Sequence, residues 1–252
     1  RDRSPSRGLG DVYKRQMLAK GASVVAVSVC DVTAAPTLIQ KCKDAGNVPI
    51  IFFNKEITDY DVINSYENAY QVTSTGGDYG ASIQAQMVID YWKEHPEMDK
   101  NGDGKLQLVY LMGDPGHTAS QPRCDYLKST IEDAGIEIDL LAEDTGMWVT
   151  ATAKEKMDAW VSKYGDEIEC CVAGNDAMAL GALQAIQSAG RTVGTDIYLV
   201  GVDALSEALE DVLAGTMTGT VFNDHFSQSH GAADAAINFC LLYTSPSPRD
   251  GL

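Results

Sequence analysis

Short apolar runs alternate with amphipathic stretches along most of the chain, and this alternation restricts the possible folds more than any other feature of the sequence. Eight runs have the length and composition of buried strands, namely residues 23–29, 48–53, 69–72, 106–112, 136–142, 168–174, 197–202 and 219–222. Seven helical patterns accompany them, namely 35–45, 77–95, 119–134, 150–163, 176–189, 204–214 and 224–238. Continuous apolar strands separated by helices are typical of parallel sheets that helices cover on both faces. The sequence therefore predicts an α/β fold.

The two ends of the chain differ in composition from the acidic chain between them. Residues 1–16 read RDRSPSRGLGDVYKRQ, and residues 240–252 read CLLYTSPSPRDGL. A DNA sequence that encodes residues 240–250 also encodes residues 6–16 when its opposite strand is read. One DNA element therefore flanks the insert in opposite orientations, and it resembles the transposon adapter of a sequencing library. We interpret both ends as adapter-derived tails, exclude them from the fold, and expect the insert, 17–239, to be truncated at both ends.

The composition argues against several classes of protein. The chain carries 36 acidic and 19 basic residues, a formal net charge of −17, and such a surface repels the phosphates of nucleic acids. The sequence has no run of about 18 apolar residues that would predict a membrane span. Six cysteines are too few for a disulfide scaffold in a chain of 252 residues. The adjacent Cys170 and Cys171 lie in an apolar run, where cysteine is usually a small buried hydrophobe.

Polar side chains follow six of the predicted strands at the point where each strand ends. They are Asn54, Asp114 with His117, Asp144 with Trp148, Asn175 with Asp176, Asp203, and Asn223. In open α/β sheets, ligands bind outside the carboxyl ends of the strands. Helix capping explains one or two such residues in many proteins, but six together favour a binding cleft.

The chemistry of these residues suits a polyhydroxylated ligand. Planar groups that make paired hydrogen bonds come from Asn54, Asn175, Asn223, Asp203 and Arg123. Each sugar hydroxyl both donates and accepts a hydrogen bond, so a sugar needs donors and acceptors side by side. Trp148 can stack on the apolar face of a sugar ring, and His117 can donate to a hydroxyl. The alternatives are a core position for Trp148 and a structural role for His117.

Residues 99–107, with the sequence DKNGDGKLQ, match the first nine positions of an EF-hand calcium loop. Side-chain oxygens would come from Asp99, Asn101, Asp103 and Gln107, and a backbone carbonyl from Lys105, with the turn glycine at Gly104. An EF-hand ends in a bidentate glutamate, but Tyr110 stands at that position here. The sequence therefore predicts a bound Ca²⁺ whose last ligand comes from elsewhere in the chain.

Several motifs in register resemble one family. The motifs VPIIFFNKE, DKNGDGKLQ, GDPGH, DTGMWVTATAKEKMDAW, GNDAMALGA, VGVDALSEAL and GTVFND are similar to those of galactose/glucose-binding periplasmic proteins of sugar ABC importers. The resemblance covers nearly all of the insert and implies the two-lobe type I periplasmic-binding-protein fold, with parallel sheets and a cleft between the lobes. It implies an incomplete first lobe of residues 17–73 plus 223–239 and a second lobe of residues 74–222, between the adapter-derived tails 1–16 and 240–252.

The resemblance also implies a function. A hexose similar to galactose or glucose would be bound outside the cytoplasm, by a monomer without catalytic activity. It would then be delivered to the membrane permease of an ABC importer, with a chemoreceptor as a further partner. The implied sugar-binding residues are Asn54, His117, Arg123, Trp148, Asn175, Asp203 and Asn223. The implied calcium ligands are Asp99, Asn101, Asp103, the backbone oxygen of Lys105, Gln107 and Glu169, the last of which supplies the missing carboxylate.

Two departures from the family pattern leave the identity of the hexose open. The family carboxylate two residues after the histidine is Ala119 here. The family's first strand, which carries an aromatic and an aspartate for the sugar, is not found. We expect it to be missing from the centre of the first sheet, between the strands at 23–29 and 48–53, which would leave each of them with an unpaired edge.

Two other functions compete with a transport protein. The effector domain of a sugar-responsive repressor shares the fold, although the calcium loop and the acidic charge argue against it. An enzyme acting on a sugar or nucleotide would need a recognisable catalytic motif. The sequence contains no phosphate loop, no Gly-x-Ser-x-Gly elbow and no metal-binding pair of histidines. His117 and Asp203 are the candidate acid and base for that alternative.

Overall fold

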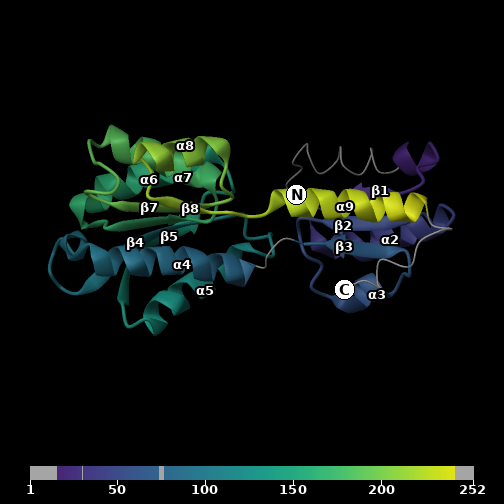
Figure 1. The fold of residues 1–252 in the computed structure, drawn as a ribbon, viewed down its shortest axis with the longest axis horizontal. Helices are drawn as coiled ribbons and strands as arrows, with labels where there is room; N and C mark the ends of the chain where they lie inside the picture. Colours follow the sequence, from purple (N-terminus) through teal and green to yellow (C-terminus); the bar gives the residue numbers. More distant parts are fainter. Residues whose placement is uncertain (1–15, 30, 74–76, 242–252) are drawn as a thin grey trace. The chain divides into compact units, whose positions relative to one another are not determined.

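The computed structural model describes residues 16–29, 31–73 and 77–241. Apart from Gln16, Cys240 and Leu241, the two predicted tails lie outside these ranges. The chain forms two compact units (Figure 1): unit 1 combines the chain up to Ser74 with the chain from Asp224, and unit 2 is the continuous segment Thr75–Asn223. Within the described ranges, no helix is both long enough and apolar enough to cross a membrane.

Unit 1 is a three-stranded parallel sheet with helices packed against it. The strands β1 (Val25–Val27), β2 (Ile50–Phe53) and β3 (Ala69–Val72) lie in the order β1-β2-β3. The helices are α2 (Ala35–Asp44), α3 (Tyr60–Asn64) and α9 (His225–Cys240), with a short 3₁₀ turn η1 (Val32–Ala34) before α2. Although α9 follows unit 2 in the sequence, it packs against all three strands of unit 1.

The pairing of β1 with β2 corrects an expectation from the sequence. We expected a missing central strand to leave both of these strands with an unpaired edge, but they pair directly in parallel, with Val25 opposite Ile50 and Val27 opposite Phe52. The amide of Val25 donates to the carbonyl of Pro49 at 2.9 Å. Both strands are apolar, and each supplies the backbone donors and acceptors that the other needs. The sheet is therefore continuous without a strand between them.

Unit 2 is a five-stranded parallel sheet in the order β5-β4-β6-β7-β8. Its strands are β4 (Lys105–Met112), β5 (Glu137–Thr145), β6 (Cys170–Ala173), β7 (Tyr198–Val202) and β8 (Gly219–Val221). Its helices are α4 (Gly77–Glu94), α5 (Ser120–Asp133), α6 (Thr150–Tyr164), α7 (Asp176–Ser188) and α8 (Ser206–Ala214), with 3₁₀ turns η2 (Pro96–Met98) and η3 (Gly165–Glu167).

Helices cover both faces of this sheet (Figure 1), with α4 and α5 on one face and α6, α7 and α8 on the other. Successive side chains of a strand point to opposite faces. Cys170 therefore packs with α4 and α5, whereas Cys171 packs with α6 and α7, and both thiols are fully buried. This confirms the prediction that the adjacent cysteines are small buried hydrophobes. Burial raises the pKa of the Cys171 thiol to about 12.

The sequence predicted every strand that the structure describes, and the α/β class with parallel sheets is confirmed. The first strand is shorter than predicted, with only Val25–Val27 in regular pairing. The sequence missed α3, a single short helix of five residues that Asp59 caps by accepting from the amide of Asp61.

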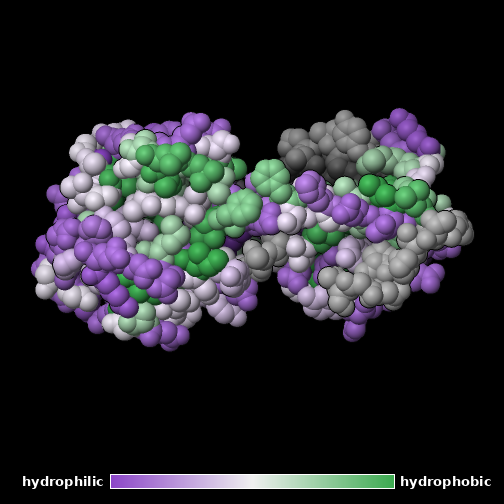
Figure 2. Space-filling model, in the orientation of Figure 1, coloured by the Kyte–Doolittle hydropathy of each residue, from purple (hydrophilic) through white to green (hydrophobic). Residues whose placement is uncertain are grey.

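A row of exposed hydrophobic side chains lies along α8 on the surface of unit 2. Leu205, Leu209 and Leu213 stand one helical turn apart at the start of α8 and along it, with exposed fractions of 38%, 44% and 89%. Figure 2 shows hydrophobic surface where Figure 1 places α8. Leu213 is the most exposed of the three, so this row is not part of the core.

Candidate functional site

The carboxyl ends of the unit 2 strands bear most of the predicted sugar-binding residues. His117 follows β4, Trp148 follows β5 and Asn175 follows β6, while Asp203 and Asn223 follow β7 and β8. Parallel strands end at the same edge of a sheet, so these residues share one edge of unit 2. Asn54 follows β2 in unit 1, where its Nδ2 lies 3.5 Å from the Ser28 hydroxyl.

The indole of Trp148 is the centre of a cluster at this edge. The His117 ring meets it edge-on, with 5.3 Å between the ring centroids. The Arg123 guanidinium carbon lies 5.7 Å from the indole centroid, in the range of a cation–π contact. Arg123 is 9% exposed and donates from Nη1 to the carbonyl of Gly174 at 2.6 Å. The structure thus brings three of the predicted residues together.

Gly113, which follows β4, makes room for the indole. A Cβ atom at Gly113 would lie only 2.0 Å from Cζ2 of Trp148. Thr145 supports the same turn, because its hydroxyl donates to the carbonyl of Gly113 at 2.6 Å. The indole therefore rests directly on backbone, which fixes the plane that it presents.

The substitution Gly113→Ala is expected to displace the Trp148 indole, because the new methyl group and the ring cannot occupy the same space. Overpacking of this kind costs about 1–3 kcal/mol of stability, and a change in tryptophan fluorescence should accompany it. Gly80→Ala in α4 is the matched control, since a Cβ there meets nothing within 4 Å. If both variants kept the parent fluorescence and urea midpoint, the close packing of Trp148 on Gly113 would be wrong.

Asp203 and Asn223 form a second polar pair at the same edge. The Asn223 Nδ2 donates to the Asp203 carboxylate at 3.1 Å, and the amide of Asp203 donates to the carbonyl of Val221 at 2.8 Å. Neighbouring strand ends are thus tied by both backbone and side chain. An amide next to a carboxylate offers a donor and acceptors within one small area.

Asn175 has a structural task in addition to its place at the edge. Its Oδ1 accepts from the amide of Met178 at 3.0 Å and caps the N-terminus of α7. Such capping is the ordinary role of asparagine before a helix. The side chain therefore has one oxygen already engaged, and its orientation is fixed.

Two buried polar side chains brace this edge: Asp176, which the sequence places after a strand as a candidate for the cleft, and Gln84, which it did not single out. Asp176 is fully buried and accepts from the amide of Leu205 at 2.8 Å and from the hydroxyl of Thr220 at 2.6 Å. Its burial raises the pKa of the carboxyl group. Gln84, inside α4, donates to the carbonyl of Ala173 at 2.9 Å. A polar residue on the apolar face of a helix is the signal that could have revealed Gln84.

Strained backbone marks the same positions. Five of the six described non-glycine residues with positive φ are at or next to predicted sugar-binding positions: Asn54 (71°), Met147 (55°), Trp148 (63°), Asp203 (122°) and Ala204 (55°). Such conformations cost free energy and cluster at functional sites in proteins. Sequence patterns do not report them, so this support for the site comes only from the structure.

The predicted calcium loop is a tight turn ordered around one carboxylate. The two oxygens of Asp99 accept from the amides of Gly102 (2.7 Å), Asp103 (3.1 Å) and Gly104 (2.9 Å). Both glycines have positive φ, at 73° and 75°, which a side chain would disfavour. The Asp103 carboxylate in turn accepts from the amide of Lys105 at 2.8 Å.

Glu169, although distant in sequence, lies against this loop. Its carboxylate accepts from the amide of Lys100 at 2.7 Å and from the amide of Gln107 at 3.0 Å, and Glu169 is 1% exposed. The pKa of Glu169 is raised, first by burial and further by the charges of Asp99 and Asp103. The negative charges of Asp99 and Asp103 therefore act on the buried carboxyl group of Glu169.

Gln107 presents an oxygen that suits a cation. Its Nε2 donates to Asp103 at 2.9 Å, while its Oε1 is buried and has no hydrogen-bond partner. A buried acceptor without a donor is rare in proteins. In the described ranges, no three His, Cys, Asp or Glu side chains gather closely enough to hold a metal by themselves. Amide and carbonyl oxygens would therefore have to complete a calcium site, and the residues present fit that requirement.

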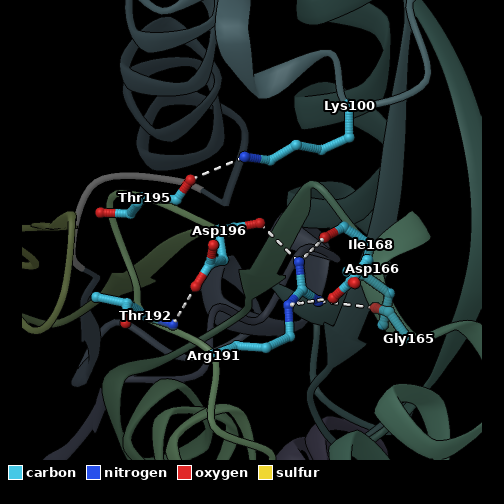
Figure 3. A network of polar contacts seen from close by, with 8 residues as sticks. All are labelled: Lys100, Gly165, Asp166, Ile168, Arg191, Thr192, Thr195 and Asp196. Carbon is cyan, nitrogen blue, oxygen red and sulfur yellow. Dashed lines mark hydrogen bonds and ion pairs between the residues drawn. The ribbon is translucent and has the colours of Figure 1, made fainter.

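A polar network links this loop to the connection between α7 and β7 (Figure 3). Lys100 donates from Nζ to the carbonyl of Thr195 at 2.9 Å. In the same network Arg191, 8% exposed, donates to the carbonyls of Gly165 (2.9 Å), Ile168 (2.7 Å) and Asp196 (2.6 Å). The guanidinium thus joins the connection between α6 and β6 to the connection between α7 and β7, on the side of unit 2 that lies away from the sugar-site edge.

One chain forms two α/β units, and polar side chains lie at the carboxyl ends of their parallel strands. This arrangement defines the class of two-lobe binding proteins with the type I periplasmic-binding fold. The model of the family described as "Periplasmic binding protein domain" matches residues 15–240, so this chain belongs to that family.

Relatives with named functions support this placement. The chain is 40% identical, over 88% of its length, to the D-galactose/methyl-galactoside binding periplasmic protein MglB of Haemophilus influenzae. It is 32% identical, over 67% of its length, to a xylitol-binding protein of Mycolicibacterium smegmatis. The chain spans 65% of the length of the first relative and 48% of the second. Both are named for binding and not for catalysis, in agreement with the expectation of a protein that is not an enzyme.

Solved structures confirm the fold. A periplasmic solute-binding protein of an ABC transporter from Actinobacillus succinogenes, with bound D-allose, is 21% identical with a TM-score of 0.77 and covers 96% of this chain and 80% of its own. A solute-binding protein from Bacillus halodurans, with bound myo-inositol, is 23% identical with a TM-score of 0.75 and covers 93% of this chain and 75% of its own. At these identities the likeness shows the fold alone.

Proposed function

We propose that the protein binds a hexose outside the cytoplasm for import by an ABC transporter. The observation that carries this proposal is the cluster of His117, Arg123 and Trp148 at the carboxyl edge of the unit 2 sheet. It combines an aromatic face with directional donors, which is what a ring bearing both C–H and O–H groups requires. The 40% identity to the galactose-binding relative supports a hexose similar to galactose or glucose.

Each residue of the edge has a distinct task in this proposal. Trp148 stacks on the apolar face of the sugar ring, and His117 and Arg123 donate to ring or hydroxyl oxygens. Asp203 accepts from two hydroxyls while Asn223 donates beside it, as their 3.1 Å hydrogen bond arranges. Asn175 keeps its amide nitrogen for the ligand while its oxygen caps α7. Asn54, in unit 1, stays a predicted contact.

A calcium ion bound by the loop of residues 99–107 is part of the same proposal. Its ligands would be Asp99, Asn101, Asp103, the carbonyl of Lys105, Gln107 and Glu169. The ion would neutralise the loop carboxylates and supply the partner that the buried Gln107 oxygen lacks. It would stabilise unit 2 and take no part in contacting the sugar.

The proposed partners follow from the family. The membrane permease of an ABC importer would receive the sugar, and a chemoreceptor would be a second partner of the loaded protein. The alternative, an effector domain that controls transcription, is less well supported, because the net charge of −17 disfavours nucleic acid. We propose that the protein acts as a monomer.

Calorimetric titration with D-galactose, D-glucose, D-xylose and myo-inositol tests the proposal. We expect a hexose to bind most tightly, and Asp203→Asn to weaken its affinity at least tenfold, because a hydrogen bond to a charged group contributes about 1.5–3 kcal/mol. Asp133→Asn, at the exposed end of α5, is the matched control and should leave affinity unchanged. Absence of binding to every sugar in the panel would contradict the proposed function.

A further inference from the structure

The predicted sugar site contains a buried positive charge, that of Arg123, for which no carboxylate of the described residues forms an ion pair. Arg123 is 9% exposed, its hydrogen bond to Gly174 uses a neutral carbonyl, and its Nε has no hydrogen-bond partner. The ion pairs formed by the described residues include none with Arg123. A buried guanidinium is costly unless an opposite charge or full hydrogen bonding compensates it. The ligand is the natural source of that compensation.

The N-terminus of α5 adds positive potential at the same place. Its N-cap is Ala119, which has no side chain that can accept a hydrogen bond, and its first turn has no acidic residue. The start of α4 lies against it, since a Cβ at Gly77 would be 3.2 Å from the carbonyl oxygen of Ala119. Helix N-termini carry partial positive charge and attract anions. The N-terminus of α5 is therefore a second, separate feature that favours a negatively charged group on the ligand.

The neighbouring side chains are also donors. His117 accepts at Nδ1 from the amide of Ala119 at 3.1 Å, so the neutral ring carries its proton on Nε2 and donates there. The Trp148 Nε1, next to Arg123, is buried without a hydrogen-bond partner. A hydroxyl group in this environment could accept, but Ala119 offers no side-chain acceptor for its proton. A carboxylate only accepts, and its two oxygens match the two-pronged donation of a guanidinium.

We propose that the ligand is a hexose derivative that bears an ionised carboxylate, a hexuronate, with this carboxylate placed at Arg123 and the N-terminus of α5. The inference rests on the proposed function and specifies its substrate class. The rest of the ring would meet Trp148 and the Asp203–Asn223 pair as a neutral hexose would. Because the whole chain is acidic, long-range repulsion slows the approach of such a ligand, so added salt should raise its association rate.

Calorimetric titration of the chain with D-galacturonate and D-glucuronate, alongside D-galactose and D-glucose at equal ionic strength, tests the proposal. We expect one uronate to bind at least tenfold more tightly than its parent hexose. Equal or tighter binding of the neutral hexose would overturn the uronate assignment and leave the proposed function intact. Binding of none of the four sugars would overturn both. Tighter binding of galactose 6-phosphate than of either uronate would show that the anionic group of the ligand is a phosphate. It would overturn the assignment of a carboxylate.

Ala119→Asp is the decisive variant, because it adds a carboxylate at the N-terminus of α5, one helical turn before Arg123. We expect uronate affinity to fall at least tenfold while galactose affinity is unchanged or rises. Ala34→Asp is the matched control: Ala34 is also an alanine N-cap without a side-chain hydrogen bond, with φ/ψ of −79°/−12° against −88°/−13° at Ala119. It should change neither affinity. If folded Ala119→Asp protein, with the parent melting temperature, keeps full uronate affinity, the inference is wrong.

Discussion

Removal of calcium is expected to lower the melting temperature of unit 2 by about 5–10 °C. A ligand that binds only the folded state at about 100 times its Kd stabilises it by about 2.7 kcal/mol, and about 1 kcal/mol shifts the melting temperature of a domain this size by about 2–4 °C. The physical reason is the buried Glu169 beside the loop, because burial and, to a smaller extent, the charges of Asp99 and Asp103 raise the pKa of its carboxyl group, and a cation would offset both effects. Differential scanning calorimetry with and without a chelator measures the effect.

Two variants make this test specific. Glu169→Gln removes the buried carboxylate with little change of shape, so the difference between calcium-loaded and chelated protein should vanish. Glu167→Gln removes an exposed carboxylate two residues away, in η3, and should keep the full difference. Identical melting of the parent protein in calcium and in chelator would rule out a calcium ion in the loop.

The substitution Arg191→Met is expected to destabilise unit 2 by about 2–3 kcal/mol, chiefly because it leaves the buried carbonyl of Ile168 without a donor. The guanidinium donates to the carbonyls of Gly165, Ile168 and Asp196, and methionine fills a similar volume without donating to any of them. A buried acceptor left without a donor costs about 1–3 kcal/mol. A shift of the urea midpoint at constant slope measures the loss.

Lys93→Met is the matched control for Arg191→Met. Lys93 is exposed in the last turn of α4, so replacing it removes one positive charge without uncovering buried carbonyls. Its expected effect is within about 0.5 kcal/mol, as for most surface substitutions. A loss below about 1 kcal/mol in Arg191→Met would mean that water satisfies the three carbonyls and that the network is not a structural clamp.

The periodicity of the sequence predicted the strands and long helices well. Strands that helices cover on both faces consist of continuous apolar residues, which are easy to recognise in the sequence. It could not predict α3, whose five residues give too little periodicity to read. It also could not predict that β1 pairs with β2. The register and order of parallel strands depend on distant backbone partners, and Val25 carries no mark that it lies opposite Ile50.

The residues of the candidate site were predictable where a polar or aromatic residue type directly follows a predicted strand. Asp203 and Trp148 stand immediately after strands or in short loops, so their place at the edge followed from the topology. The buried Asp176 and Gln84 were less visible, since their roles depend on which carbonyls and amides face them. The same is true of the positive φ at Trp148 and Asp203, which results from tertiary packing and not from residue type.

The discontinuity of unit 1 determines the order in which this protein can be completed during translation. The three strands of its sheet leave the ribosome first, but α9, which packs against all of them, follows only after the whole of Thr75–Asn223. At about 5–20 residues per second, this interval lasts roughly 8–30 s. During that time unit 2 can finish folding as one uninterrupted segment, whereas the apolar surface that α9 will cover stays open to chaperones. Of the two units, unit 1 is therefore the last to reach its final structure.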